Sequence, residues 1–229
     1  CWLLEDNPYG ELRYEGEALP HVFDLNARRG DRGGLEAEVI YTSTLSKVLA
    51  PGLRLGFLVA PEPVVDRIVR AKQSADLHTA TFNQYLALDL LESGLLDRQI
   101  PLLRDCYRER RDAMLAALDR HFPPGVRWTR PGGGLFLFVT LPYGLSGSEL
   151  LPAALKREVA FVPGEDFCPG FGGEHTLRLN FSSNPPDLIE EGIRRLGRLV
   201  ADAVEALDPA ARSKPAPNPS FRTSVLQSK

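Results

Sequence analysis

The sequence predicts an α/β protein in which two folded pieces are joined by a long helix. Three observations support this prediction. Residues 1–60 alternate short apolar segments, which are typical of strands, with polar and glycine-rich connections. Residues 61–122 carry apolar side chains at helical spacing, and residues 123–207 mix strand-like and helical segments again.

The domain boundaries follow from the same pattern. We expect residues 1–100 to form part of a larger domain with a mostly parallel sheet and helices, and residues 123–207 to form a smaller α+β domain. Residues 101–122 are then the helix between them. Residues 208–229 are rich in Pro, Ala and Ser and lack any periodicity, so this segment is predicted to be a disordered tail.

Each element has its own signal in the sequence. Strand candidates in the first piece lie at 2–4, 38–42 and 53–59, with a polar connection at 28–34. Helical spacing follows at 61–75, 82–91 and 100–122. In the second piece we expect strands at 126–129, 135–141, 159–162 and 176–181, and a helix at 149–156. Asn184 and Pro185 have the pattern of an N-cap and a first-turn proline before a last helix.

The composition is that of an ordinary globular chain, with 43% apolar and 25% charged residues. A formal net charge of −3 gives no electrostatic signature of binding to nucleic acid or to a membrane surface. Cys1, Cys106 and Cys168 are widely spaced, so the sequence predicts neither a disulfide framework nor a metal site. It also lacks a membrane-spanning apolar run and the basic start of a signal peptide, so we expect a cytoplasmic protein.

The stretch from Tyr41 to Gly56 is the most informative part of the chain. An apolar strand runs into a turn of small hydroxyl residues, followed by Lys47 and then by Arg54. Hydroxyls and cations together suit a phosphate, and a lysine held there can form an imine with an aldehyde; pyridoxal 5′-phosphate carries both groups. The chain has five lysines against twenty-two arginines, which argues against a chance placement. The alternative is a surface lysine that follows a strand.

A carboxylate and a phenol follow the first strand candidate. Asp6 and Tyr9 lie in a turn marked by Asn7, Pro8 and Gly10. In an open α/β sheet, ligands bind beyond the carboxyl ends of the strands, which is where these two side chains are expected. A carboxylate can keep a pyridinium nitrogen protonated, and a phenol can donate a hydrogen bond to the ring's 3-oxygen. The alternative is a turn-forming aspartate beside a half-buried aromatic residue.

Arg178 interrupts a strand pattern near the end of the second piece. Leu177, Leu179 and Phe181 alternate with it and predict a buried face, so Arg178 shares the opposite face with Asn180. Its guanidinium fork matches a carboxylate bidentately, which suits the α-carboxylate of an amino acid. A solvent-facing arginine on a strand is the alternative.

Five motifs, in this order, resemble the class I/II aminotransferases of pyridoxal-phosphate fold type I. They are EDNPYGELRY at 5–14, TLSKVLAPGLRLG at 44–56, PGGGLF at 131–136, VPGEDF at 162–167 and LRLNFS at 177–182. The resemblance covers roughly residues 1–205. The nearest branch includes 2-aminoadipate and aromatic aminotransferases and the aminotransferase-like half of MocR-type regulators. The implied fold is the C-terminal part of the cofactor-binding large domain followed by a smaller α+β domain.

The resemblance also implies a role for each candidate residue. Lys47 would bind the cofactor aldehyde and then move a proton between the substrate and the cofactor. Asp6 would pair with the pyridine nitrogen and Tyr9 with the 3-oxygen.

The resemblance also implies which residues bind the cofactor phosphate and the substrate carboxylate, and which partners the protein has. Thr44 and Arg54 would hold the phosphate, with Ser46 as a further candidate, and Arg178 would bind the substrate carboxylate. Members of the family are homodimers, and their substrates are amino acids and 2-oxo acids. The resemblance therefore implies a transaminase with pyridoxal 5′-phosphate as its cofactor.

The resemblance begins inside the large domain of the family. The preceding half of the relatives supplies a glycine-rich helix N-terminus at the phosphate, an aromatic ring stacked on the cofactor and an asparagine at the 3-oxygen. Helix N-termini bind anions well, so we expect the residues shown to bind the cofactor weakly by themselves. We expect either part of a longer polypeptide or a truncated product with little activity of its own.

Two other functions are compatible with these residues. One is the effector domain of a MocR-type transcriptional regulator, whose DNA-binding segment would precede Cys1. The other is a pyridoxal-phosphate-dependent β-lyase on the same scaffold. Arg178 favours a reaction in which the α-carboxylate is retained, but it does not separate transamination from elimination.

Overall fold

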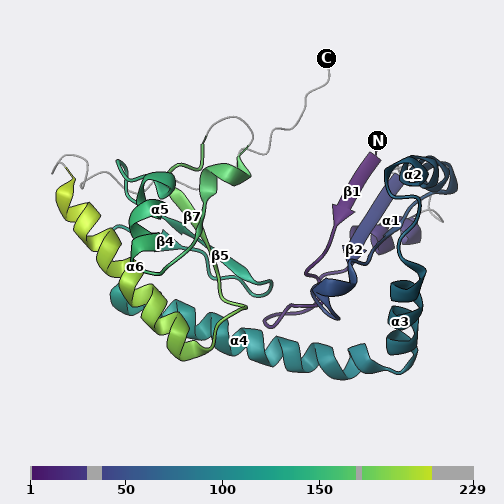
Figure 1. The fold of residues 1–229 in the computed structure, drawn as a ribbon, viewed down its shortest axis with the longest axis horizontal. Coiled ribbons are helices and arrows are strands. Elements are labelled where there is room, and N and C mark those ends of the chain that lie inside the picture. Colours follow the sequence, from purple (N-terminus) through teal and green to yellow (C-terminus); the bar gives the residue numbers. More distant parts are fainter. Residues whose placement is uncertain (1, 30–37, 169–171, 208–229) are drawn as a thin grey trace, which may run out of the picture. The chain divides into compact units, whose positions relative to one another are not determined.

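The computed structural model describes residues 2–29, 38–168 and 172–207 (Figure 1). The predicted tail at 208–229 and most of the connection predicted at 28–34 lie outside these residues. The chain divides into two compact units, which are described separately below. The first comprises Cys1–Asp105 with Gly132–Gly134, and the second comprises Cys106–Pro131 with Leu135–Lys229.

The first unit is built on a three-stranded sheet in the order β1-β2-β3. Strands β1 (Trp2–Asp6) and β2 (Glu38–Thr44) are parallel, and α1 (Val22–Arg29) lies between them in the sequence. Strand β3 (Gly56–Val59) pairs with β2 in the antiparallel sense. This pairing departs from the parallel arrangement expected for most of the sheet. The physical reason is the connection at 45–55, which contains no crossover helix that could return the chain for a parallel pairing.

The segment before β3 was predicted to be a strand from residue 53, and that start is wrong. A 3₁₀ turn spans Pro51–Leu53, and Arg54 adopts the left-handed conformation with φ 53°. Pro51 fixes its own φ for a turn, and Arg54 then reverses the chain, so extended pairing begins only at Gly56. The strand is short because turn geometry overrides the apolar pattern.

Two helices follow in the first unit, α2 (Glu62–Ala75) and α3 (Thr81–Glu92). Ala87 is the buried residue of α3, whereas its large side chains Phe82 and Tyr85 remain 77% and 69% exposed. Strands β1 and β3 also expose apolar side chains, including Trp2 and Phe57. Large apolar side chains are thus exposed both on the sheet and on α3 of this unit.

The second unit has a four-stranded antiparallel sheet in the order β4-β5-β7-β6. Its strands are β4 (Arg127–Trp128), β5 (Phe136–Thr140), β6 (Val162–Pro163) and β7 (Thr176–Asn180). Its helices are α4 (Leu95–His121), which begins among residues of the first unit, α5 (Gly147–Lys156) and α6 (Pro186–Ala206). A further 3₁₀ turn, η3, spans Gly164–Phe167.

Helix α6 packs against the end of α4 within the second unit (Figure 1). A Cβ atom on Gly197 would lie 2.4 Å from the carbonyl oxygen of His121, so only glycine fits at this crossing. Within α6, Glu191 accepts hydrogen bonds from Arg194 and Arg195 at 2.6–2.8 Å. These hydrogen bonds, first that of Arg194 and then that of Arg195, lower the pKa of Glu191 to about 2.

Several predicted boundaries differ from the structure. The long helix begins at Leu95 rather than at residue 100 and continues through Pro101, whose missing N–H removes only one helical hydrogen bond. Pairing in β6 starts only at Val162, and the N–H of Val159 instead bonds back to the carbonyl of Ala154 at the end of α5 at 3.0 Å. The last helix is capped by Pro185 rather than Asn184, without a side-chain hydrogen bond. Helix α1 was not predicted.

Candidate functional site

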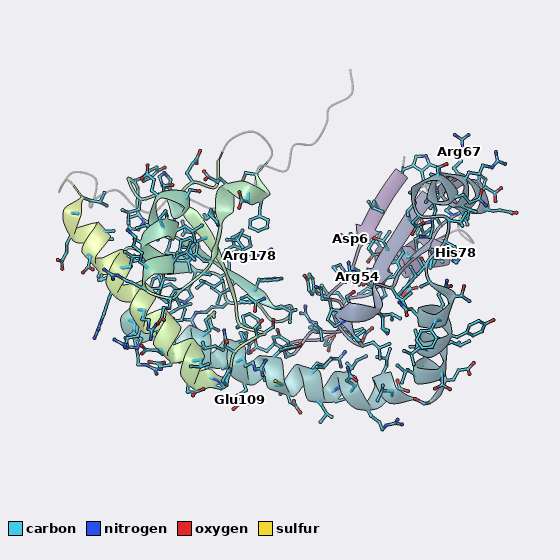
Figure 2. All side chains as sticks on the ribbon, viewed as in Figure 1. Asp6, Arg54, Arg67, His78, Glu109 and Arg178 are labelled. Atoms are coloured by element: carbon cyan, nitrogen blue, oxygen red, sulfur yellow. The ribbon has the colours of Figure 1, made fainter. Side chains whose placement is uncertain are left out.

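Asp6 stands at the carboxyl end of β1, next to the end of its parallel neighbour β2. In register, Asp6 faces Thr42, and the Thr42 hydroxyl donates a hydrogen bond of 3.1 Å to the Asp6 carboxylate. The Asp6 side chain is exposed (Figure 2). Asp6 thus lies at the carboxyl end of a parallel strand, the end of an open α/β sheet at which ligands generally bind.

The turn after β1 is anchored from the opposite face of the sheet. The Asn7 backbone N–H donates to the carbonyl of Thr42 at 2.9 Å, and the Asn7 carbonyl accepts the Ser43 hydroxyl at 2.9 Å. The Asn7 amide nitrogen lies 3.1 Å from Nδ1 of His21 and 3.5 Å from the Tyr41 hydroxyl. Because side chains alternate along a strand, this network holds the backbone while Asp6 projects to the other face.

Glu5 extends the same network. Its carboxylate accepts the backbone N–H of Phe23 at 2.9 Å and lies 3.5 Å from Nδ1 of His21. Glu5, Asn7, His21 and Thr42 were not predicted to be site residues. Their only signal in the sequence is the strand register, which cannot be read before the partner strand is known.

Lys47 and Tyr9 are brought together by the two turns that follow β1 and β2. The Lys47 ammonium lies 5.9 Å from the centroid of the Tyr9 ring, a cation–π distance, and both side chains are partly buried. The loop that carries Lys47 is closed by the Leu49 N–H bonding to the Leu45 carbonyl at 2.8 Å. Gln99 also donates to the carbonyl of Val48 at 2.7 Å. The lysine therefore sits on a fixed turn rather than on a free surface loop.

The predicted phosphate-binding residues are partly assembled. The Thr44 hydroxyl accepts the backbone N–H of Ser46 at 3.1 Å and donates to the carbonyl of Leu55 at 2.9 Å. Arg54 directly precedes Leu55, so all three candidates lie around one turn. The exposed Arg54 guanidinium donates to the carbonyl of Pro51 at 3.2 Å, folding back on its own turn (Figure 2). An anion at this turn would compete with that weak contact.

A cavity of about 300 Å³ in the first unit includes one of the predicted site residues. Thr44 lines it, together with residues such as Asn7, Tyr41 and Ser43. Asp6, Tyr9 and Lys47 are not among its lining residues. The cavity therefore borders the predicted phosphate-binding turn but does not contain the residues predicted to hold the cofactor ring.

Arg178 belongs to the second unit and stands in the middle of β7. In register it lies between Phe138 of β5 and Val162 of β6. Leu177 and Leu179 are buried on the other face of the strand, which confirms the predicted alternation. The Arg178 side chain is partly buried on its own face (Figure 2). The structure thus places Arg178 on the sheet face away from the apolar core.

Among residues 2–29, 38–168 and 172–207, no group of three or more His, Cys, Asp or Glu side chains could hold a metal ion. Within the same ranges, no helix combines the length and apolar character that crossing a bilayer requires.

Comparison with known proteins identifies the relatives of this chain. The sequence profile described as aminotransferase class I and II matches residues 1–196. A 2-aminoadipate transaminase of Thermus thermophilus is 48% identical over 199 residues, which are 86% of this chain and 48% of the relative. An aromatic-amino-acid aminotransferase of Thermococcus litoralis is 43% identical over 203 residues, which are 89% of this chain and 47% of the relative.

The solved structures agree with the sequence relatives. The α-aminoadipate aminotransferase LysN of Thermus thermophilus, solved with N-(5′-phosphopyridoxyl)-L-leucine, superposes with a TM-score of 0.82 at 45% identity. The match covers 89% of this chain and 51% of LysN. The chain therefore spans about half the length of the relatives that it matches.

The two sheets and the lysine-bearing turn place the protein among those with pyridoxal-phosphate fold type I. The profile match over most of the chain makes the assignment more specific. The chain belongs to the class I and II aminotransferase family.

Proposed function

We propose that the protein acts as a transaminase that moves an amino group from an amino acid to a 2-oxo acid, with pyridoxal 5′-phosphate as its cofactor. One observation carries the proposal: Lys47 lies over the Tyr9 ring on a fixed turn after β2, and β2 is the parallel neighbour of the strand that ends in Asp6. Identities of 43% and 48% with aminotransferases favour this function over that of a regulator. The activity is proposed for the whole protein.

The side chains of the first unit match the chemical groups of the cofactor. The bound cofactor would act as an electron sink that stabilises negative charge at the substrate Cα. Asp6, held by Thr42, offers a carboxylate to a protonated ring nitrogen, and Tyr9 offers a hydroxyl to the ring's 3-oxygen. Lys47 would offer its Nζ to the aldehyde and would move a proton between the substrate Cα and C4′ of the cofactor.

The phosphate of the cofactor and the α-carboxylate of the substrate each have candidate partners among the predicted residues. Thr44, Ser46 and Arg54 surround one turn and would hold the phosphate. Arg178 would bind the α-carboxylate of the substrate through its fork of N–H donors. Because the amino donor leaves as a 2-oxo acid before the acceptor binds, both substrates would use Arg178 in turn.

The proposal extends to assembly, location and domain limits. A second copy of the chain is a suitable partner for the apolar surface of the first unit, since Phe82 and Tyr85 of α3 are largely exposed. We propose a cytoplasmic homodimer. We also retain domain limits of 1–100 and 123–207, with the helix at 101–122 between them.

Borohydride trapping tests the central assignment. Mixing the protein with the cofactor should give a visible absorption band, and reduction followed by peptide mapping should locate the adduct on Lys47. Lys47→Ala should abolish the adduct. Lys72→Ala is the matched control, because Lys72 is a partly buried lysine, as Lys47 is, but lies on helix α2 and pairs with Asp76 at 2.6 Å. An adduct on any lysine other than Lys47 contradicts the assignment.

The reaction class needs a separate assay. A transaminase should convert an amino acid only when a 2-oxo acid such as 2-oxoglutarate is present. Pyruvate and ammonia formed without an acceptor would instead identify a β-lyase.

A further inference from the structure

The guanidinium of Arg178 is enclosed by two aromatic rings of the second unit. Its central carbon lies 4.1 Å from the ring centroid of Phe136 and 4.4 Å from that of Phe167. The distances fit cation–π stacking, for which arginine is well suited. The guanidinium makes no hydrogen bond or ion pair with any residue that the structure describes.

The two rings come from different parts of the second unit. Phe136 lies on β5, on the same sheet face as Arg178, and Phe138 of that strand stands directly opposite Arg178. Phe167 ends the η3 turn and meets Phe138 edge to face, with ring centroids 5.6 Å apart and an interplanar angle of 80°. Phe167 is thus supported by a second ring while it covers the guanidinium.

The η3 turn that carries Phe167 is itself held in place. At its start, a Cβ atom on Gly164 would lie 1.7 Å from the Thr176 hydroxyl oxygen, so the backbone here is pressed against the first residue of β7. Glu165 in the same turn accepts a hydrogen bond from the Ser148 hydroxyl. The position of Phe167 relative to β7, and hence to Arg178, is therefore set by packing on both sides of the turn.

We propose that Phe136 and Phe167 form an aromatic clamp that positions Arg178 to receive a planar carboxylate at its N–H edge. The rings would stack on the guanidinium plane, so its N–H groups would remain available to bind an anion. The proposal rests on the proposed function, in which Arg178 binds the substrate carboxylate. Phe136 and Phe167 would be positioning residues that act through Arg178.

The clamp affects binding because it reduces the conformational entropy that the Arg178 side chain would otherwise lose when a carboxylate binds. An arginine side chain has many rotamers, and fixing one of them on binding weakens the affinity. The rings would fix one rotamer beforehand and would cover part of the guanidinium, which reduces the entropy lost on binding. Removing one ring should therefore weaken carboxylate binding roughly three- to tenfold, as expected from the loss of one cation–π contact.

Arginine-detected NMR of the complete chain tests the clamp without requiring any activity. Ring currents should move the Arg178 Nε–H resonance upfield of those of exposed arginines. Phe167→Leu should reduce this displacement, because the ring of Phe136 at 4.1 Å remains, and Phe167→Tyr, which keeps a ring, should retain it in full. Tyr143→Leu is the control, since Tyr143 is 40% exposed against 37% for Phe167 and its ring contacts His175 instead. An unshifted Arg178 resonance in the unaltered protein overturns the clamp.

Binding of pyruvate to the cofactor-loaded chain tests the consequence for function. Pyruvate is a suitable probe because its carboxylate is its only charged group. Phe167→Leu should raise its dissociation constant roughly three- to tenfold with little change in the rate of the chemical step, and Phe167→Tyr should restore affinity. Equal affinity in Phe167→Leu and the unaltered protein would refute the positioning role.

The two proposals can fail independently. If Arg178→Ala itself leaves pyruvate binding unchanged, the carboxylate role of Arg178 in the proposed function is wrong and the positioning role falls with it. If Arg178→Ala abolishes binding while Phe167→Leu reduces the ring-current shift but leaves affinity unchanged, only the positioning role of Phe167 is wrong.

Discussion

Gly164 begins the turn that presents Phe167, and replacing it with alanine tests how rigidly this turn is held. The new Cβ would lie 1.7 Å from the Thr176 hydroxyl oxygen and 2.8 Å from the carbonyl oxygen of Gly173. The Thr176 hydroxyl currently donates to that same carbonyl at 2.8 Å, and Thr176 is buried. The threonine must therefore rotate away and lose its hydrogen bond, and the backbone carbonyl must also move.

These contacts set the size of the effect. Overpacking of this kind costs about 1–3 kcal/mol, and the lost hydrogen bond adds about 1 kcal/mol. Alanine has less conformational freedom than glycine in the unfolded chain, and this difference raises the free energy of unfolding by about 0.4–1 kcal/mol. The net loss in the free energy of unfolding of the second unit should be about 2 kcal/mol. For a domain of this size that corresponds to a fall in Tm of roughly 8–16 °C.

A double-mutant cycle with Thr176→Ala separates the clash from a general effect of alanine. Thr176→Ala removes the hydroxyl and its hydrogen bond, so Gly164→Ala should cost about 1 kcal/mol less in that background. Gly192→Ala serves as control, because a Cβ there meets nothing within 4 Å and alanine favours the α6 helix by about 1 kcal/mol. The free energies of unfolding can be measured by thermal or denaturant unfolding. If the losses caused by Gly164→Ala and Thr176→Ala simply add in the double mutant, the two side chains do not compete for space.

Three further predictions concern other parts of the molecule. Thr42→Val removes only the hydroxyl that bonds to Asp6, so it should weaken cofactor binding roughly five- to tenfold in an absorbance titration, and unchanged affinity would contradict a role for this contact. Glu191 has a folded pKa of about 2 against an ordinary value of 4.5, so its stabilising contribution is present above pH 4.5 and is lost as the pH falls toward 2. Glu191→Gln should therefore flatten the dependence of the unfolding free energy on pH over that window in acid titrations. Gly197→Ala should lower Tm despite its gain in helix propensity, because its Cβ would lie 2.4 Å from the carbonyl oxygen of His121; a raised Tm would show that α6 can shift on α4.

The sequence predicted strand β7 and the orientation of Arg178 because the signal is local. Apolar residues at 177, 179 and 181 define one face with a period of two, and this pattern does not depend on any other part of the chain. The ring of Phe167 over Arg178 could not be predicted in the same way. Phe167 comes from a different turn, and its approach depends on how β6, η3 and β7 pack together.

In the first unit, too, the sequence predicted the local motifs but not the tertiary contacts between them. The motif that contains Asp6 and the turn that contains Lys47 were evident as chemical groups in the sequence. The support from Thr42 and the approach of Lys47 to Tyr9 depend on the parallel pairing of β1 with β2, which is a tertiary feature. Arg54 was predicted to be part of a strand, and its left-handed conformation shows that a turn set by Pro51 overrode the apolar pattern.

Both units use one structural device to present a charged side chain. Asp6 projects from β1 while its neighbour Asn7 is tied by hydrogen bonds on the opposite face, and Arg178 projects from β7 between the buried Leu177 and Leu179. Because successive side chains of a strand point in opposite directions, the residues that fix the backbone are the sequence neighbours of the residue that meets the ligand. Substitutions at the neighbours should therefore act on ligand geometry as well as on stability. The cofactor and carboxylate sites are then expected to be more sensitive to changes at Asn7 and Leu177 than the exposure of Asp6 and Arg178 alone would suggest.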